Sequence, residues 1–398
     1  MPSLKDTTQI IHRAAQIGLQ IARERMTNLK PTSASEVPRS AEALTPEWLT
    51  AVLCKDIPGA RVLSVKPVDG SAGTSSRRRI SLTYNQAGVD AGLPASMYTK
   101  STAQWTQRMV LGLAGVIRGE SGFFSQIRPH LKIEAPWGYH ASCDPASWRS
   151  ITMMEDIVAT KGVSFCSPAT DITRTRIEDL LANMAAWHGA MWNSSQFNGE
   201  LSWLMTPARF RAKTSALIAM QKRSLIGAQR AERVIPPALF PRQQELWNAY
   251  GRSFELLSSG PQTLLHGDSH VGNTYMTRDG RMGYSDWQVV QRGGWAYDYA
   301  YILTTSLKVA DRRAWEDELL RFYLDRLLAF GGPRLGFDAA WLQYRQSTLY
   351  PYFAWVFTIG AGALQPAMQP DSISIPIIER TSNAIEDLES TKVLQSKK

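Results

Sequence analysis

The sequence has 398 residues and a net charge of +9, from 44 Lys and Arg residues against 35 Asp and Glu residues. At about 150 residues per domain, this length allows two or three packed units with sizeable cores. Basic residues are scattered except for Arg77–Arg79, which disfavours nucleic acid as a partner and is compatible with a polyanionic small ligand.

Cysteine usage and apolar segments disfavour two further classes. Cys54, Cys143 and Cys166 are odd in number and lack metal-ligand spacing, which argues against a secreted disulfide framework and predicts a reducing, cytoplasmic location. The uncharged segment 346–370 has an uninterrupted apolar part of about fifteen residues, short of the about 20 that a bilayer span requires. We therefore expect a buried helix there and no integral membrane span.

Residues 1–40 are predicted to form a helix and a linker. Ile10, Ile17 and Ile21 recur at helical spacing among arginines, which indicates an amphipathic helix and not a secretory signal. A packed accessory helix is the favoured interpretation, with a transit or membrane-surface role as the alternative. Residues 31–40, rich in Pro, Ser and Thr, are typical of a linker.

Residues 41–155 have the pattern of a small lobe. Thr45 as an N-cap before Pro46 predicts a helix start. Extended segments joined by glycine-containing turns follow, which predicts an antiparallel sheet. These segments are Arg61–Val68, Arg79–Tyr84, Ser96–Lys100, Pro136–Ala141 and Ser150–Met154, with helical sequence from about 105 to 130 between the third and the fourth.

From residue 156 to residue 398 the chain is predicted to be mostly helical. In the segment IEDLLANMAAWHGAMW, apolar side chains fall on one helical face, and we expect Trp187 and His188 in the core. A strand-rich first part and a helix-rich second part predict an α+β protein with two lobes, an N-lobe at 41–155 and a C-lobe at 156–398.

The segment LLHGDSHVGNTYM, residues 264–276, concentrates acids, bases and amides in one loop. A turn at residues 277–280 predicts a hairpin that brings Asp286 back beside this loop. Asp268 and Asn273 have the offset of the protein-kinase loop H-R-D-L-x-x-x-N, in which Asp accepts the substrate hydroxyl proton and Asn binds magnesium. Asp286 then supplies the second carboxylate that such a metal site needs.

Phosphoryl transfer explains why these residue types occur together. Hard cations that neutralise a triphosphate prefer oxygen ligands, here the amide of Asn273 and the carboxylate of Asp286, while Asp268 orients the attacking hydroxyl. We therefore predict ATP and Mg²⁺ as cofactors and a small-molecule hydroxyl acceptor. The acceptor's identity and the choice between ATP and GTP stay open.

Two other interpretations use the same loop. His266, Asp268 and His270 could bind zinc or iron in a hydrolase, since imidazole and carboxylate suit these metals. The other histidines show no paired ligand spacing, so support of the loop backbone is favoured for both loop histidines. The second alternative is a catalytically silent nucleotide-binding or scaffolding protein.

HGDSHVGN followed by SDW resembles the H-G-D-x-H-x-x-N and D-[FW] signature of the aminoglycoside phosphotransferase and choline kinase group, which has the bilobal protein-kinase-like fold. Within that group, SDWQVVQRGGWAYDYAYIL, GESGFFSQIRPHLKIEAPWGY and MMEDI look like the ecdysteroid-kinase-like branch. The resemblance extends from about residue 43 to about residue 330. It implies transfer of the γ-phosphoryl group of ATP to a small-molecule hydroxyl.

The resemblance also implies nucleotide-binding residues. Lys100 is expected at the α- and β-phosphates, paired with Glu120, although a strand-end lysine is otherwise commonly solvated. Segment 69–76 occupies the position of the phosphate-covering loop; it lacks a full G-x-G-x-x-G, so Gly70 and Gly73 are equally compatible with a hairpin turn. The hinge is expected to contact adenine through backbone groups and methionine side chains, which are also compatible with core packing. The hinge residues are Met153, Met154, Glu155 and Ile157.

The segment after Asp286 disfavours a protein kinase. Only about a dozen residues separate Asp286 from Asp298 and no A-P-E follows, which leaves no room for a peptide-docking segment. Asp298 matches a bracing residue of the group and is predicted to be structural. Gln288 replaces the glycine of Asp-Phe-Gly, so the inactive flips of protein kinases are not expected. Aromatic residues that could line a pocket for a steroid-like, terpenoid or macrolide alcohol are Trp192, Trp203, Trp295, Tyr350, Tyr352, Phe353 and Trp355.

Overall fold

A computed structural model of the protein describes residues 4–27, 30–215, 219–361 and 368–395. The chain divides into two compact units, Met1–His130 with Pro136–Gly162 and Leu131–Ala135 with Val163–Lys398. The first unit includes the N-terminal helix and extends beyond the lobe boundary expected after residue 155, because the short helix that follows the last strand of the sheet also belongs to it.

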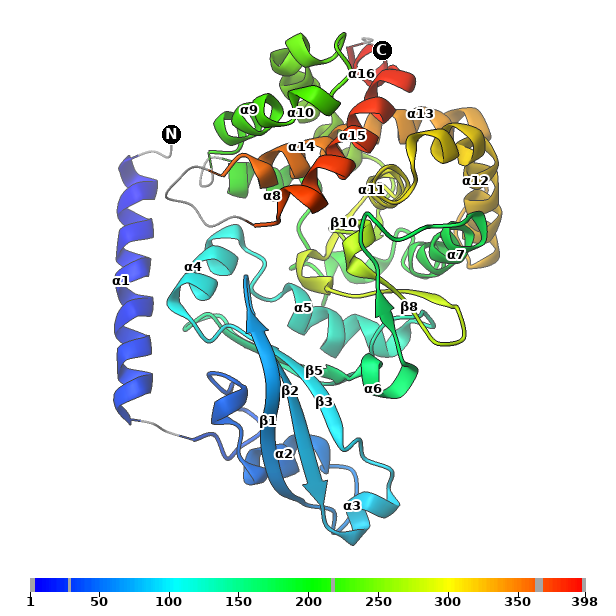
Figure 1. Ribbon diagram of the computed structural model, residues 1–398. Helices are drawn as coiled ribbons and strands as arrows, with labels where there is room; N and C mark the ends of the chain where they lie inside the picture. The colour runs from blue at the N-terminus through cyan, green and yellow to red at the C-terminus, as the bar shows by residue number, and fades with distance from the viewer. Residues whose placement is uncertain (1–3, 28–29, 216–218, 362–367, 396–398) are drawn as a thin grey trace. The chain divides into compact units, whose positions relative to one another are not determined.

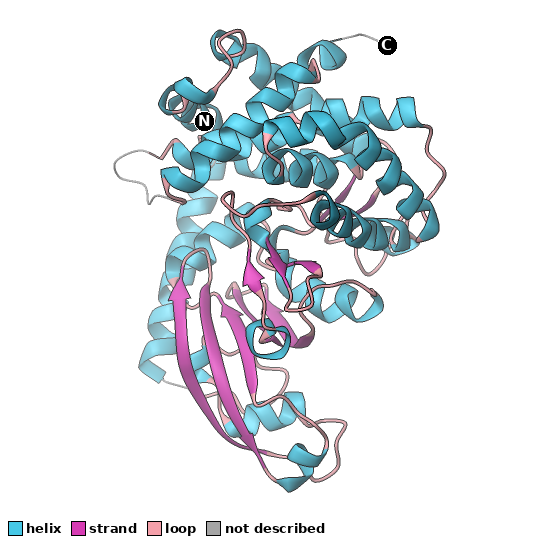
Figure 2. Ribbon diagram, turned by 45° about the vertical axis from the view of Figure 1, so that its right-hand side comes forward, coloured by secondary structure: helices cyan, strands magenta, loops and turns pink. Residues whose placement is uncertain are grey.

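The first unit is built on a five-stranded antiparallel sheet in the order β1-β2-β3-β5-β4 (Figures 1 and 2). Its strands are β1 (Val62–Ala72), β2 (Ser76–Tyr84), β3 (Ser96–Ser101), β4 (Gly138–Asp144) and β5 (Arg149–Glu155). Ile80, Leu82 and Tyr84 alternate with exposed residues along β2, so one face of the sheet is buried. That face packs against α2 (Pro46–Leu53) in a core that includes Trp48 and Met97.

The helices of the first unit correct one expectation. Thr45 caps α2 by accepting a hydrogen bond from the amide of Trp48, as predicted. Residues 105–130, however, do not form one helix, because Gly115 ends α4 in the left-handed region at φ +75°. Its helices besides α2 are α1 (Leu4–Thr27), η1 (Ala41–Ala43), α3 (Gln86–Asp90), α4 (Trp105–Ala114), α5 (Gly119–Gly122), η2 (Phe123–Ile127), η3 (Arg128–His130) and α6 (Ile157–Lys161).

The second unit is mostly helical, so the predicted α+β class is confirmed. Its longer helices are α7 (Arg174–Ala190), α8 (Pro207–Ser215), α9 (Met220–Arg230), α10 (Gln243–Ser259), α11 (Ala296–Ser306), α12 (Val309–Ala329), α13 (Phe337–Ser347), α14 (Leu349–Ile359), α15 (Asp371–Asp387) and α16 (Ser390–Gln395). Short helical turns are η4 (Ser195–Asn198), η5 (Glu232–Val234), η6 (Phe240–Arg242), η7 (Val271–Asn273) and η8 (Trp287–Val289). Two small sheets pair β6 (Ser164–Phe165) with β8 (Thr274–Met276) and β9 (Met282–Tyr284), and β7 (Thr263–Leu265) with β10 (Gln291–Gly293).

The apolar segment 346–370 contributes a buried helix, as expected. The segment contains α14, most of whose residues are buried, and ends beyond it. Residues 362–367 of the segment lie outside the described residues. Among the residues that the structure describes, no helix combines the length and apolar character needed to cross a bilayer.

Candidate functional site

The hairpin predicted around the polar loop is present in the second unit. β8 and β9 pair antiparallel, with Thr274 opposite Tyr284. The amide of Ser285 donates to the carbonyl oxygen of Asn273 at 2.8 Å, so Asp286 follows directly on the residue bonded to Asn273. Asp286 has φ +60°, a left-handed conformation that is uncommon outside glycine, although aspartate and asparagine adopt it more readily than other residues. Such backbone outliers concentrate at functional sites.

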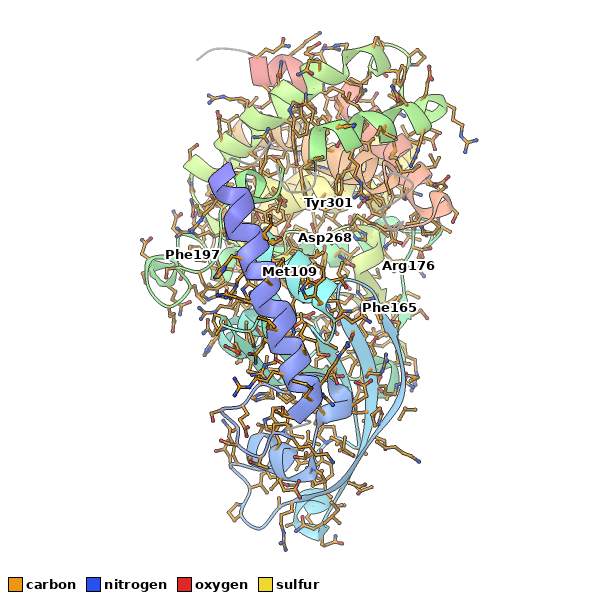
Figure 3. All side chains as sticks on the ribbon, turned by 90° about the vertical axis from the view of Figure 1, so that its left-hand side faces the viewer. Met109, Phe165, Arg176, Phe197, Asp268 and Tyr301 are labelled. Carbon is orange, nitrogen blue, oxygen red and sulfur yellow. The ribbon has the colours of Figure 1, made fainter. Side chains whose placement is uncertain are left out.

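Both carboxylate oxygens of Asp268 accept hydrogen bonds. Tyr301 Oη donates to Oδ1 at 3.1 Å, and Asn273 Nδ2 donates to Oδ2 at 3.1 Å and to the backbone oxygen at 2.8 Å. Asp268 and Tyr301 are labelled in Figure 3. The Asp268 side chain remains 35% exposed. Burial raises the pKa of Tyr301 well above its ordinary value, and the charge of Asp268 adds to this, so the phenol stays a donor. Asp268 is thus oriented at both oxygens and still reachable.

The loop backbone is held by Asp298, which α11 carries. Its Oδ2 accepts from the amide of His266 at 2.6 Å and its Oδ1 from the amide of Gly267 at 3.0 Å. His188, buried on α7 as predicted, places Nε2 3.4 Å from the same carboxylate. The bracing role expected for Asp298 is therefore what these hydrogen bonds provide.

Both ring nitrogens of His266 contact backbone atoms. Nδ1 accepts from the amide of Asp268 at 3.2 Å, and Nε2 lies 2.9 Å from the carbonyl oxygen of Ser285. His270 Nδ1 accepts from the amide of Gly272 at 3.0 Å, and burial lowers the pKa of His270 against the opposing effect of Asp268. Within the described ranges, no three His, Cys, Asp or Glu side chains form a group that could hold a metal ion. These contacts support the backbone-supporting interpretation over the zinc or iron hydrolase.

Two of the expected aromatic residues lie against the loop. Tyr350 Oη donates to the carbonyl oxygen of Gly267 at 3.0 Å, and the Trp355 ring packs edge-on against His270 at 5.1 Å. By contrast, Trp295 stacks on Tyr323, in the core. Tyr352 and Phe353 belong to the packing of α14 against α10. Trp192 follows α7 and Trp203 follows η4, and both are half-buried.

In the first unit, Lys100 and Glu120 form the expected ion pair. Lys100 Nζ lies 2.7 Å from Glu120 Oε1, with side-chain exposures of 6% and 9%. Register places Arg77 of β2 and Thr152 of β5 on either side of Lys100. Cross-strand partners share a face, so Arg77 and Lys100 lie together on the face opposite the one that packs against α2.

The β1–β2 hairpin is longer than expected, so its two glycines differ in position. Gly70 lies within β1 opposite Arg78, where a Cβ atom would come 2.1 Å from the backbone oxygen of Arg77. Gly73 lies at the tip, with no atom within 4 Å of an added Cβ. Gly70 is therefore needed for close packing of the hairpin itself, and only Gly73 lies in the connecting loop.

The hinge residues divide between the two faces of β5. Met153 is in the core with Trp48, whereas Met154 alternates to the face that carries Lys100. The Glu155 carboxylate accepts from the amide of Trp137 at 3.1 Å and from Thr160 Oγ1 at 2.7 Å. Ile157 begins α6 and is buried. Of the two methionines, only Met154 lies on the face that carries Lys100.

Sequence reasoning noted Arg77 only as part of the basic run Arg77–Arg79, without placing it beside Lys100, and it missed Tyr301. The signal for Arg77 is strand parity, since it lies an odd number of residues from the core residue Ile80. The signal for Tyr301 is helical spacing, since it lies one turn beyond Asp298 and faces the same loop.

Comparisons with known proteins extend these observations. The sequence model of the phosphotransferase enzyme family matches residues 138–337. No curated protein matches the sequence significantly. Similar solved structures include the aminoglycoside phosphotransferase APH(3'')-Id from Streptomyces rimosus, 13% identical, with a TM-score of 0.42 and coverage of 74% of this chain and 92% of that one. Choline kinase LicA from Streptococcus pneumoniae is 12% identical, with a TM-score of 0.43 and coverage of 83% and 94%.

The matched range contains the catalytic-loop candidates and Asp286 and excludes α1, Lys100 and Glu120. It spans half of the chain, 200 of 398 residues, counted from 138 through 337. The chain therefore belongs to the phosphotransferase enzyme family.

Proposed function

We propose that the protein is an ATP- and Mg²⁺-dependent kinase that transfers the γ-phosphoryl group to a hydroxyl of a small organic molecule. The observation that carries this proposal is the oxygen-donor set of Asp268, Asn273 and Asp286 on one hairpin. The oxygen donors of Asn273 and Asp286 suit Mg²⁺, which favours phosphoryl transfer over a hydrolase that binds zinc or iron through imidazole.

Each member of the set has a separate role. The side-chain NH₂ group of Asn273 donates to Asp268, so the Oδ1 atom of Asn273 remains for a cation. Asp286 supplies a second, charged ligand. When bound, Mg²⁺ would neutralise charge on the phosphates. Asp268 accepts the proton of the acceptor hydroxyl as the new O–P bond forms and ADP leaves. The Asp268 carboxylate can accept this proton while it keeps its hydrogen bonds to Tyr301 and Asn273, because a carboxylate has about four acceptor sites.

The nucleotide is assigned to the sheet face of the first unit that carries Lys100. Lys100 and Arg77 supply adjacent positive charges for phosphates, and Glu120 fixes the Lys100 side chain. Met154, on the same face, is the candidate for the apolar side of adenine. Gly73 at the hairpin tip can approach phosphate without a side-chain clash.

The acceptor is proposed to be lipophilic. Tyr301, Tyr350 and Trp355 surround the loop that carries Asp268. The groups near its carboxylate are the Tyr301 phenol, the Asn273 amide and the His270 imidazole, whose pKa is lowered by burial. A polycationic acceptor would instead require several carboxylates. A steroid-like, terpenoid or macrolide alcohol fits better, and assignment to the ecdysteroid-kinase-like branch, supported by the segments SDWQVVQRGGWAYDYAYIL and MMEDI, is part of the proposal.

The test is a mass-spectrometric screen of hydroxylated lipophilic and cationic metabolites incubated with ATP and Mg²⁺. We expect phosphorylated products among the lipophilic alcohols. Asp268→Asn should lower turnover by about 10²- to 10⁴-fold, the usual contribution of a general base, while ATP affinity stays within about twofold. ATP binding with neither product nor ATP hydrolysis would favour the silent nucleotide-binding alternative, and an unchanged Asp268→Asn rate would remove Asp268 from its role.

A further inference from the structure

Helix α1 lies outside the range that matches the family, yet it is bound to α4 by a buried ion pair. Arg108 Nη1 and Nη2 donate to the two carboxylate oxygens of Glu24 at 3.0 and 2.6 Å. Arg108 is 0% exposed, and it also donates to the backbone oxygens of Thr102 and Ser147. A buried guanidinium needs such a carboxylate, because an unpaired charge away from water is strongly destabilising.

Apolar and backbone contacts accompany the ion pair. Ile17 and Ile21 pack with Met109 of α4, and Figure 3 shows α1 crossing over Met109. The Trp105 indole donates to the backbone oxygen of Ala14 at 3.2 Å. These contacts follow the α1 face that was predicted from the apolar spacing, so the accessory-helix interpretation agrees with the packing.

The residue before Arg108 joins α4 to the tip of the β1–β2 hairpin. Gln107 Nε2 donates to the backbone oxygen of Gly73 at 3.1 Å, and its Oε1 accepts from Ser76 Oγ at 3.1 Å. Gln107 is only 2% exposed, so the two bonds are shielded from water. α4 therefore holds the hairpin tip through Gln107 and is itself held by α1 through the adjacent residue.

We propose that α1 positions the tip of the β1–β2 hairpin for nucleotide binding, acting through α4, with Glu24, Arg108 and Gln107 as positioning residues. This inference rests on the proposed function, because it takes the tip residues Gly73–Ser76 to approach the phosphates. Removing the carboxylate of Glu24 leaves Arg108 without its charged partner, and α4 with Gln107 shifts to restore solvation of the guanidinium.

The test is a double-mutant cycle in the full-length protein with Glu24→Gln and Gln107→Ala. The affinity for ATP·Mg²⁺ is measured by calorimetry, and amide hydrogen exchange is followed over residues 70–76. Each single variant should weaken ATP·Mg²⁺ binding about tenfold and speed amide exchange at the tip. The double variant should bind ATP·Mg²⁺ no more weakly than the single variant with the lower affinity, because the effects of interacting residues do not add. Glu47→Gln is the matched control, because this exposed residue of α2 undergoes the same change of charge.

Different results would contradict the role of α1 and the proposed kinase function. Fully additive effects, or unchanged tip exchange in Glu24→Gln, would overturn the role of α1. Equal effects from Glu47→Gln would do the same, because they would reflect charge alone. If Glu24→Gln does not fold, Trp105→Phe, which deletes the bond to Ala14, replaces it in the cycle. A wild-type protein that does not bind ATP·Mg²⁺ would contradict the proposed function, whereas the exchange measurements, which need no nucleotide, still decide whether α1 holds the tip.

Discussion

Two buried tyrosines on α11, Tyr299 and Tyr301, differ in whether the hydroxyl group makes a hydrogen bond. Tyr301 Oη donates to Asp268, whereas Tyr299 Oη, equally buried, has no hydrogen-bond partner within the described part of the chain. A hydrogen bond to a charged group contributes about 1.5–3 kcal/mol, so its loss should be visible in the rate if the Asp268 carboxylate must be oriented. Tyr299 offers a control with the same ring, the same helix and no bond to lose.

We therefore predict that Tyr301→Phe lowers kcat about tenfold or more and leaves KM for ATP within about twofold. Tyr299→Phe should leave both constants unchanged. The measurement is steady-state phosphorylation of the acceptor that the screen identifies. Equal losses in the two variants would show that Tyr301 contributes only packing, and a rise in KM alone would mean that it holds the nucleotide and not Asp268.

At the scale of elements, α14 is held close to α9 by two glycines. A Cβ atom on Gly227 would come 1.7 Å from the backbone oxygen of Val356, and one on Gly360 would come 1.9 Å from the backbone oxygen of Arg223. Because backbone cannot move aside as a side-chain end can, an added methyl must separate the two helices. α14 carries Trp355, so such a shift reaches the loop that contains Asp268 through His270.

Gly227→Ala is expected to lower the free energy of unfolding by about 1–3 kcal/mol, the usual cost of overpacking, although alanine favours helix by about 1 kcal/mol. Gly251→Ala is the control, because its added Cβ would only reach ordinary contact with Arg211 at 3.5 Å. Urea denaturation followed by circular dichroism gives both values. If Gly227→Ala were as stable as Gly251→Ala, the close approach of the two helices would not exist in solution.

The elements also show which features a sequence can reveal. The hairpin beside Asp268 and Asn273 was predictable because the polar loop and its turn lie within one short segment. The break of the expected helix at Gly115 was not, because glycine inside a helical pattern can either continue it or adopt positive φ. The length of β1 was missed for a related reason, since Gly70 pairs within the strand and packs against the Arg77 backbone.

Contacts between distant segments were beyond local patterns altogether. The pairing of Glu24 with Arg108 joins residues 84 positions apart, and neither has a neighbour in the sequence that indicates the other. The Lys100–Glu120 pair was expected only through the family resemblance, and the structure contains it. Met153 and Met154 were expected together in the hinge, and strand alternation places them on opposite faces.

For the whole molecule, cation-dependent nucleotide binding should appear as a gain in thermal stability. A ligand at a hundred times its Kd stabilises the native state by about 2.7 kcal/mol, which raises the melting temperature by a few degrees. ATP with Mg²⁺ should therefore stabilise the wild-type protein, and ATP with a chelator should do so less, because the chelator removes the cation that Asp286 is proposed to bind. Asp286→Ala should lose the difference between these two conditions and retain the shift that ATP alone produces.

Alanine is strained at φ +60°, so Asp286→Asn, which tolerates this conformation and removes the charge, must show the same loss if the carboxylate is responsible. Asp268→Asn, a neighbouring carboxylate with no assigned metal contact, should keep the full Mg²⁺-dependent shift. Retention of that shift in both Asp286 variants would mean that the cation binds elsewhere.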